Sequence, residues 1–91
     1  MAAGKKRERL QVIRDILKVV RDHRKIKPTR LLYSSNLSPQ MFKEYVDELL
    51  AKKFINANLD GKNKTFSLTE KGQNFLQEYK LIEKFVDNFG L

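Results

Sequence analysis

Two short runs of alternating apolar residues surround the dipeptide Asp60-Gly61, and this feature places the strongest constraint on the fold. The first run covers residues 54–59, and the second covers 64–68 with its apolar side chains on one face. A period of two is typical of a half-buried strand. Asp60-Gly61 favours a type I′ turn, because both central positions of that turn require a positive φ. The sequence therefore predicts a β-hairpin.

Helical patterns lie on both sides of this hairpin. In three segments the apolar residues recur at steps of three and four, which is the spacing of one helical face. A further short helix is expected after Pro28, because proline is favoured in a first helical turn. Ser38 and Thr69 each precede such a segment, as N-cap residues do. The predicted helices run from Lys5 to His23, Thr29 to Ser35, Pro39 to Lys52 and Thr69 to Leu91.

The chain has 91 residues, no cysteine and one histidine. This length accommodates one domain, which buries about 60–65% of the surface of its unfolded chain. Disulfide frameworks and thiolate metal sites are excluded, and one histidine cannot build a zinc site unaided. The sequence contains neither a carboxylate pair at a spacing that suggests acid–base catalysis nor a glycine-rich phosphate loop. We therefore expect no enzyme, no metal, no cofactor and no small-molecule substrate.

No apolar run approaches the roughly 18–20 residues that a membrane span needs, and the first residues lack the apolar stretch of a signal peptide. We expect a cytoplasmic protein without a membrane partner. Residues 1–6 are expected to form a disordered basic N-terminus.

Positive charge is concentrated in the first third of the chain. Nineteen Lys and Arg residues against eleven Asp and Glu residues give a net charge of +8. Residues 1–30 hold eleven basic and three acidic side chains, whereas residues 31–91 hold eight of each. Such asymmetry is typical of a protein that binds a polyanion on one side, and nucleic acid is the first candidate. A cationic face that only keeps the protein soluble, an acidic protein partner and anionic lipid are the alternatives.

Basic residues also form a line along the first predicted helix. At about 100° per residue they occupy a stripe that does not overlap the apolar face. The members of this stripe are Arg7, Arg14, Lys18, Arg21 and Lys25. We interpret the stripe as a track for phosphate groups.

The order helix, helix, helix, hairpin, helix is that of a winged helix-turn-helix, which is mainly α with one β-hairpin, here with an extended C-terminal helix. The residue blocks that carry a family likeness are Thr29-Arg30-Leu31 with Tyr33, Asn36-Leu37-Ser38, Tyr45-Val46-Asp47 with Leu49-Leu50, Phe54-Ile55, Phe66-Ser67-Leu68-Thr69-Glu70-Lys71-Gly72 and Phe75-Leu76. With these blocks the chain resembles the small archaeal winged helix-turn-helix DNA-binding proteins, whose members often pair through a C-terminal helix. The family commonly has glycine where this chain has Lys53. Because a left-handed residue with a Cβ costs about 1 kcal/mol, we expect the turn into the hairpin to differ.

The resemblance implies that the third helix enters the major groove of double-stranded DNA, while the second helix and the hairpin hold the backbone. Base contacts are then expected from Ser38, Gln40, Met41, Lys43 and Glu44. The third helix together with Lys53 carries three basic and three acidic residues, so the affinity must come from phosphate contacts. We expect those contacts at Arg14, Lys18, Arg21, Lys27, Thr29, Arg30, Tyr33, Lys62 and Lys64.

These features favour a DNA-binding transcriptional regulator associated with the nucleoid. The electrically neutral third helix leaves two alternatives open: an interaction module that binds an acidic protein, and an architectural chromatin protein with little sequence specificity. Single-stranded RNA is a weaker interpretation, because the aromatic residues mostly fall on faces that a small core would claim.

The last helix is longer than a core of this size needs. We expect residues 7–74 to form the winged helix-turn-helix domain and residues 75–91 to extend the C-terminal helix. Its apolar set would make a costly exposed patch in water, so the set predicts a homodimer with two-fold symmetry. The alternative is that the helix folds back onto its own domain. The predicted dimerisation residues are Tyr79, Ile82, Phe85, Val86 and Phe89.

Overall fold

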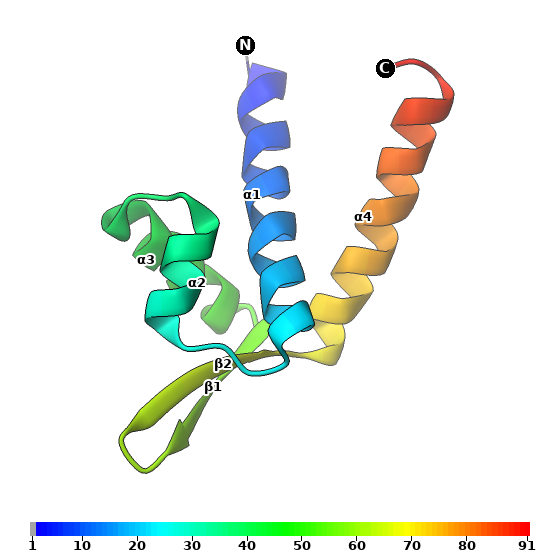
Figure 1. Cartoon of the computed structure of the whole chain (residues 1–91). Coiled ribbons are helices and arrows are strands. Elements are labelled where there is room, and N and C mark those ends of the chain that lie inside the picture. Colours follow the sequence, from blue (N-terminus) through cyan, green and yellow to red (C-terminus); the bar gives the residue numbers. More distant parts are fainter. Residues whose placement is uncertain (1) are drawn as a thin grey trace.

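The computed structural model describes residues 2–91, with side chains from Glu8 onward. Its elements follow the predicted order and confirm the fold class (Figure 1). Met1 and the side chains of residues 2–7 lie outside the described part, and the predicted disorder of residues 1–6 falls on this segment. The elements are helices α1 Ala2–His23, α2 Pro28–Ser35 and α3 Pro39–Ala51, strands β1 Ile55–Asp60 and β2 Asn63–Leu68, and helix α4 Glu70–Asn88.

Helix α1 stands at the centre of the molecule, with α2 and α3 on one side, α4 on the other and the hairpin at the end (Figure 1). It contacts α2, β2 and α4, while α3 packs on β1. The apolar face of α1 comprises Leu10, Ile13, Ile16, Leu17 and Val20. The last four are buried, whereas Leu10 is 39% exposed and lines a groove beside the outer part of α4. The core comprises Ile13, Ile16, Leu17, Val20, Ile26, Leu31, Phe42, Val46, Leu49, Ile55, Phe66 and Leu76.

The turn between α2 and α3 is built from local hydrogen bonds. Pro28 occupies the first turn of α2, and Asn36 ends this helix in the left-handed conformation with φ of 57°. Asparagine adopts that conformation more readily than most residues. The Ser38 hydroxyl accepts a hydrogen bond from the amide of Met41 at 3.2 Å and so caps α3, as the sequence predicted.

Helix α3 ends in a Schellman motif with Lys53 in the left-handed position. Lys53 has φ of 63°. Its amide donates to the carbonyl of Leu50 at 3.1 Å, and the amide of Phe54 donates to the carbonyl of Leu49 at 2.9 Å. These two bonds define the motif. The expectation of a different turn was therefore wrong: the backbone takes the shape that suits glycine, with a lysine in place.

The hairpin turn is one residue further along than the sequence predicted. Asp60 pairs with Asn63, so Gly61 and Lys62 are the two central residues. Only Gly61 has a positive φ, at 61°. This is the pattern of a type II′ turn, which needs a positive φ at its first central position alone. The predicted type I′ turn at Asp60-Gly61 was wrong, because glycine at the first central position is enough to reverse the chain.

The link between α1 and α2 pairs with the outer edge of β2. The amide of Ile26 donates to the carbonyl of Phe66 at 3.0 Å, and the Phe66 amide donates back at 2.8 Å. Ile26 is fully buried by this bridge, although it lies in a basic segment. At the far end of the hairpin Leu59 is 78% exposed, because β1 extends beyond the body of the molecule there. The alternation of apolar and polar residues in β1 therefore predicted a strand correctly. It did not predict that Leu59, one of the apolar residues, is exposed.

Helix α4 begins against the end of α3. The Thr69 hydroxyl accepts from the amide of Gly72 at 3.0 Å and donates to the carbonyl of Lys53 at 2.7 Å. The Thr69 amide donates to the carbonyl of Phe54 at 3.1 Å. Gly72 is buried under this junction, where an added Cβ would meet the Phe54 carbonyl and the Leu68 side chain. A threonine cap and a glycine thus fix the angle at which α4 leaves the hairpin.

Candidate nucleic-acid interface

The exposed face of α3 carries the side chains that were predicted to contact bases. Gln40 and Glu44 point away from the core, and Lys43 lies at the edge of the same face. Ser38 is exposed, but its hydroxyl is engaged in capping the helix. Met41 is half exposed and lies on the flank toward α1, beside a shallow hollow between the two helices. The structure therefore gathers these five residues at the first two turns of α3.

Ion pairs neutralise most of the charge on α3. The ammonium of Lys43 lies 2.7 Å from the carboxylate of Asp47, and this hydrogen bond raises the pKa of Lys43. The carboxylate of Glu48 accepts hydrogen bonds from Arg9 of α1 and from Lys52, the latter at 2.9 Å. These bonds hold the pKa of Glu48 below its ordinary value of 4.5. The exposed side chains of α3 can therefore contact a ligand, but the helix supplies no net electrostatic attraction for a polyanion.

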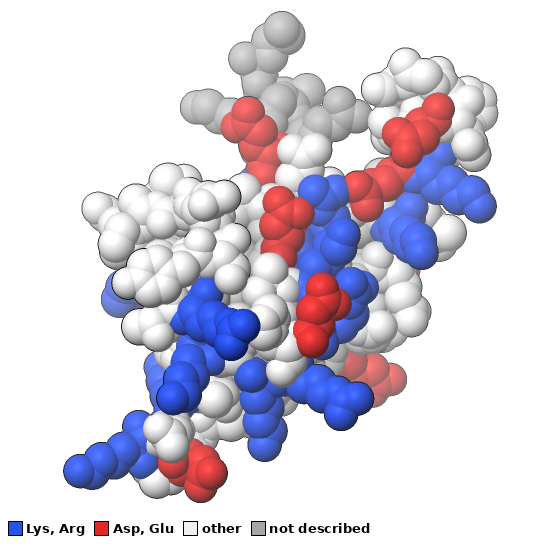
Figure 2. Space-filling view, in the orientation of Figure 1, with Lys and Arg blue, Asp and Glu red and all other residues white. Residues whose placement is uncertain are grey.

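Exposed cations lie together at the start of α2 and on the hairpin. The bridge between Ile26 and Phe66 holds these two parts of the chain side by side. Figure 2 shows Lys and Arg side chains gathered over the link between α1 and α2 and over the hairpin. Within the described part of the chain, none of the cations in this group forms an ion pair. The exposed members of the predicted phosphate set here are Lys27, Thr29, Arg30, Tyr33, Lys62 and Lys64.

Three members of the predicted basic stripe, Arg14, Lys18 and Arg21, line a groove beside α4, whereas Lys25 lies beyond the end of α1. Arg14 is paired with Asp15 at 2.9 Å and with Glu83 of α4, and its guanidinium lies 5.5 Å from the centre of the Tyr79 ring. Burial lowers the pKa of Arg14, but the hydrogen bond to Asp15 and the charge of Glu83 outweigh it and raise that pKa. Only 21% of the Arg14 side chain is exposed. The Arg7 side chain lies outside the described residues.

A groove of about 230 Å³ separates this stripe from α4. Its lining combines three α1 cations with an α4 cation that the sequence analysis did not single out, Lys80. The last helix was predicted from the spacing of its apolar residues, and its cations were not considered. The available signal was the pair Lys80 and Lys84 at positions i and i+4, which share one helical face. The groove is lined by Arg14, Lys18, Arg21, Leu76, Lys80 and Glu83.

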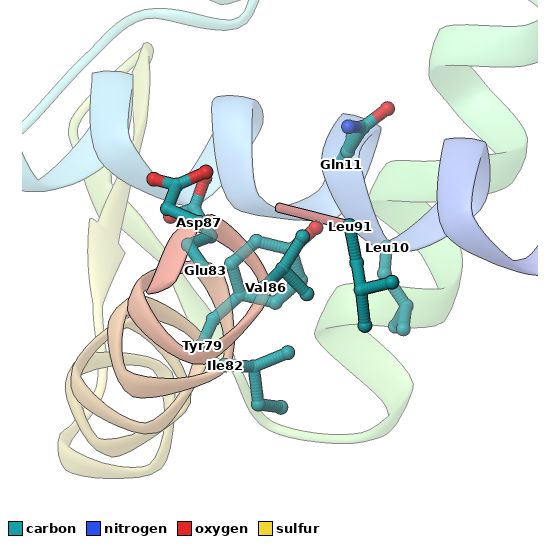
Figure 3. Close-up of a pocket in the computed structure, with 8 residues that line it drawn as sticks. All are labelled: Leu10, Gln11, Tyr79, Ile82, Glu83, Val86, Asp87 and Leu91. Carbon is teal, nitrogen blue, oxygen red and sulfur yellow. The ribbon is translucent and has the colours of Figure 1, made fainter. Parts of the chain in front are cut away.

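The predicted dimerisation residues of α4 divide into an inner and an outer group. Tyr79 is only 8% exposed and stacks on Phe75 at 5.8 Å between ring centres, so it belongs to the interior. Phe85 and Phe89 contact each other at 4.8 Å and remain exposed, as does Ile82. Beside them an apolar groove of about 430 Å³ lies between α1 and the outer part of α4 (Figure 3). It is lined by Leu10, Gln11, Tyr79, Ile82, Glu83, Val86, Asp87 and Leu91.

The side chains from Glu8 onward include no cluster of three or more His, Cys, Asp and Glu residues that could hold a metal ion. His23 is exposed, and its Nδ1 lies 2.9 Å from the carbonyl oxygen of Val19 at the end of α1. In the part of the chain that the structure describes, none of the helices has the length and apolar content needed to cross a membrane.

Comparison with known proteins identifies the family. A profile of the winged helix-turn-helix family matches residues 6–86, which is most of the chain. The chain belongs to the winged helix-turn-helix family. In winged-helix terms, α2 and α3 form the helix-turn-helix and the β1–β2 hairpin is the wing. An uncharacterized protein of Methanocaldococcus jannaschii is 35% identical over 79 residues, which cover 86% of this chain and 76% of that protein.

Two solved structures share this winged-helix fold. Sso10a-2, a DNA-binding protein from Sulfolobus solfataricus, superposes with a TM-score of 0.72 at 22% identity and covers 88% of this chain and 82% of its own. F93 from STIV, a winged-helix DNA-binding protein, superposes with a TM-score of 0.63 at 22% identity, over 82% of this chain and 84% of its own. At these identities the likeness shows the fold.

Proposed function

We propose that this winged-helix protein binds double-stranded DNA, with α3 in the major groove and the start of α2 and the wing on the backbone. The observation that carries the proposal is the group of exposed cations at the start of α2 and on the wing, none of which forms an ion pair with a described side chain. The DNA-binding proteins Sso10a-2 and F93, which share the fold, support the same assignment.

The two parts of this surface have different tasks. Lys27, Arg30, Lys62 and Lys64 neutralise phosphates and release counterions, which supplies affinity for any sequence. Thr29 and Tyr33 add hydrogen bonds to phosphate oxygens. The α3 face supplies selectivity.

Base reading falls to the α3 residues Ser38, Gln40, Met41, Lys43 and Glu44. Gln40 suits adenine and Lys43 suits guanine. Lys43 must leave Asp47 to reach a base, and an exposed pair at positions i and i+4 is readily opened. We expect modest sequence preference on top of strong electrostatic binding.

The cellular role that fits this surface is a transcriptional regulator associated with the nucleoid in the cytoplasm. We propose that two copies pair through the exposed apolar side chains of α4, with Ile82, Phe85, Val86 and Phe89 in the interface and Tyr79 supporting it from within. A two-fold dimer would present two α3 helices to successive turns of the duplex. An architectural protein would use the same backbone contacts without base reading.

The experiment that tests the proposal compares two double variants with the unmodified protein, using labelled duplexes of several sequences. Gln40→Ala with Lys43→Ala should change the ranking of sequences and reduce the average affinity little. Lys62→Ala with Lys64→Ala should weaken binding to all sequences alike, and make its salt dependence less steep by about 2 in the logarithmic slope. Unchanged binding in both variants would contradict the proposal.

Binding of an acidic protein is the second candidate. Helix α3 together with Lys52 and Lys53 has no net charge, which favours this candidate because such a helix can also pack on a protein. A gel shift with random duplex DNA at about 50 and 200 mM salt separates the two candidates. DNA binding requires a strong retarded band at the lower salt concentration that weakens at the higher one. The protein-binding alternative predicts little retardation at either.

A further inference from the structure

We infer that the groove between α1 and α4 is a second phosphate-binding site, separate from the α3 and wing surface, and that its ligand is the backbone of a second nucleic-acid segment. This inference rests on the proposed function for the nature of its ligand. The groove itself is a feature of the structure, with a volume of about 230 Å³ and cations on both walls.

The walls of the groove carry charge that is available to a ligand. Lys18 and Arg21 project from α1, and Lys80 projects from α4 across the groove. Neither Lys18 nor Lys80 forms an ion pair with a described side chain. Among the described side chains, Arg21 forms an ion pair only with its neighbour Asp22, at 3.1 Å between Nε and a carboxylate oxygen. An exposed pair of this kind contributes little and is readily exchanged for a phosphate.

The remaining lining residues are Arg14, Leu76 and Glu83, and they add little uncompensated negative charge to the groove. The one carboxylate in the lining, Glu83, is paired with Arg14, so its charge is compensated within the protein. Asp15 also contacts the Arg14 guanidinium at 2.9 Å. The apolar side chain of Leu76, which is 6% exposed, lies behind these groups. Charges beside a low-dielectric wall act more strongly on a bound anion than the same charges in open solvent.

The groove and the wing surface lie on different sides of α1. Glu8, Asp15 and Asp22 recur every seven residues, so they form an acidic line along α1. Figure 2 shows acidic side chains interrupting the basic surface along this helix. A duplex held by α3 and the wing would have to cross this line to reach Lys18 and Lys80. Two separate binding sites avoid that repulsion. Lys80 lies across the groove from Lys18 and Arg21, so these three cations can bind the same ligand.

The test is an NMR titration of the full chain with a duplex of about one helical turn, roughly 10 base pairs, in which the response of each surface is followed separately. Amide peaks of Lys18, Arg21 and Lys80 report on the groove, while those of Gln40 and Lys62 report on the α3 and wing surface. We expect the two sets to move with different midpoints, and up to two duplexes to bind per protomer.

Two matched variants, each with the same change in net charge, assign the peaks. Lys18→Glu with Lys80→Glu should weaken the groove response roughly ten-fold or more and leave the wing response in place. Lys62→Glu with Lys64→Glu should do the reverse. All four lysines are exposed, and Lys18→Gln with Lys80→Gln repeats the test with a smaller perturbation should the reversed charges unfold the chain.

The outcomes distinguish this inference from the proposed function. Groove peaks that stay unmoved while the α3 and wing peaks shift would overturn the second site alone. Groove peaks that shift while the others stay unmoved would support the second site and contradict the proposed function. A common midpoint for both sets would mean one continuous surface and would overturn the second site. Inorganic phosphate at matched ionic strength is the control: if it moves the groove peaks and duplex moves them no further, the nucleic-acid assignment is wrong.

Discussion

At the scale of single residues, Lys53 holds a backbone conformation that its side chain disfavours. The Schellman motif at the end of α3 keeps it at φ of 63°. Replacing Lys53 by glycine should therefore stabilise the protein by about 1 kcal/mol, which raises the melting temperature by roughly 4–8 °C for a domain of this size. Thermal unfolding measures the change.

Lys53→Ala is the matched control for this prediction. It removes the same charge and the same side-chain contacts but keeps the Cβ, and its melting temperature should stay near that of the unmodified protein. Equal gains in the glycine and alanine variants would show that the lysine side chain, not the backbone angle, carries the cost.

Glu48 makes stability depend on pH. Its hydrogen bonds with Arg9 and Lys52 lower its pKa in the folded state, so its contribution is present above the ordinary value of 4.5 and is lost as pH falls through the lower folded value. Glu48→Gln should be less stable than the unmodified protein by about 0.5–1 kcal/mol at neutral pH, and this gap should narrow as the pH falls below 4.5.

Urea unfolding at several pH values measures that gap. Glu78→Gln, at an exposed position of α4, serves as the control for the loss of one carboxylate. A gap for Glu48→Gln that is the same at every pH would contradict the role of the Glu48 charge.

At the scale of the elements, the position of α4 depends on a glycine. A Cβ at Gly72 would meet the carbonyl oxygen of Phe54 and would lie 2.6 Å from Cδ1 of Leu68. Gly72→Ala should therefore destabilise the protein by about 1–3 kcal/mol, although alanine is ordinarily the better helix former. Asn74→Ala, on the exposed side of the same helix, is the control and should be neutral or stabilising. A stabilising effect of alanine at position 72 would contradict the close approach of α4 to the hairpin.

Most elements could be predicted from the sequence because their causes are local. The starts of α3 and α4 follow from the caps Ser38 and Thr69, and the helical faces follow from apolar spacing. Ile26 could not be predicted as core, since one apolar residue between cations has no periodicity. Its burial results from pairing with β2, which is a contact between distant parts of the chain.

The candidate site was predictable only in part, for the same reason. Exposure of Gln40 and Lys43 follows from the helical period of α3 alone. The engagement of Arg14 by Glu83 and the burial of Tyr79 depend on how α4 packs against α1, which no local pattern of the sequence encodes. Three cations of the predicted stripe, Arg14, Lys18 and Arg21, line one groove, and the side of the molecule that they face emerged only from the fold.

At the scale of the whole molecule, the exposed apolar end of α4 predicts self-association. Phe89 is 68% exposed, and Phe85 and Ile82 are exposed beside it. Burying such side chains is worth about 1.5–3 kcal/mol each, so Phe85→Asp with Phe89→Asp should convert a dimer into a monomer. Sedimentation at high micromolar concentration measures this. Leu59→Asp removes an apolar side chain from the wing that is more exposed than either phenylalanine, and it should leave the dimer intact. A protein that is already monomeric without substitution would contradict the prediction.

The surplus of positive charge lies on the outside of a fold whose recognition helix is neutral, so binding should be driven by phosphates. The most direct measurement is the affinity for a random duplex, followed by fluorescence anisotropy between about 50 and 200 mM salt. With about five phosphates neutralised per protomer, the logarithm of the binding constant should fall with the logarithm of the salt concentration at a slope near −4 to −5. A slope near zero, or no binding at the lowest salt concentration, would contradict the account.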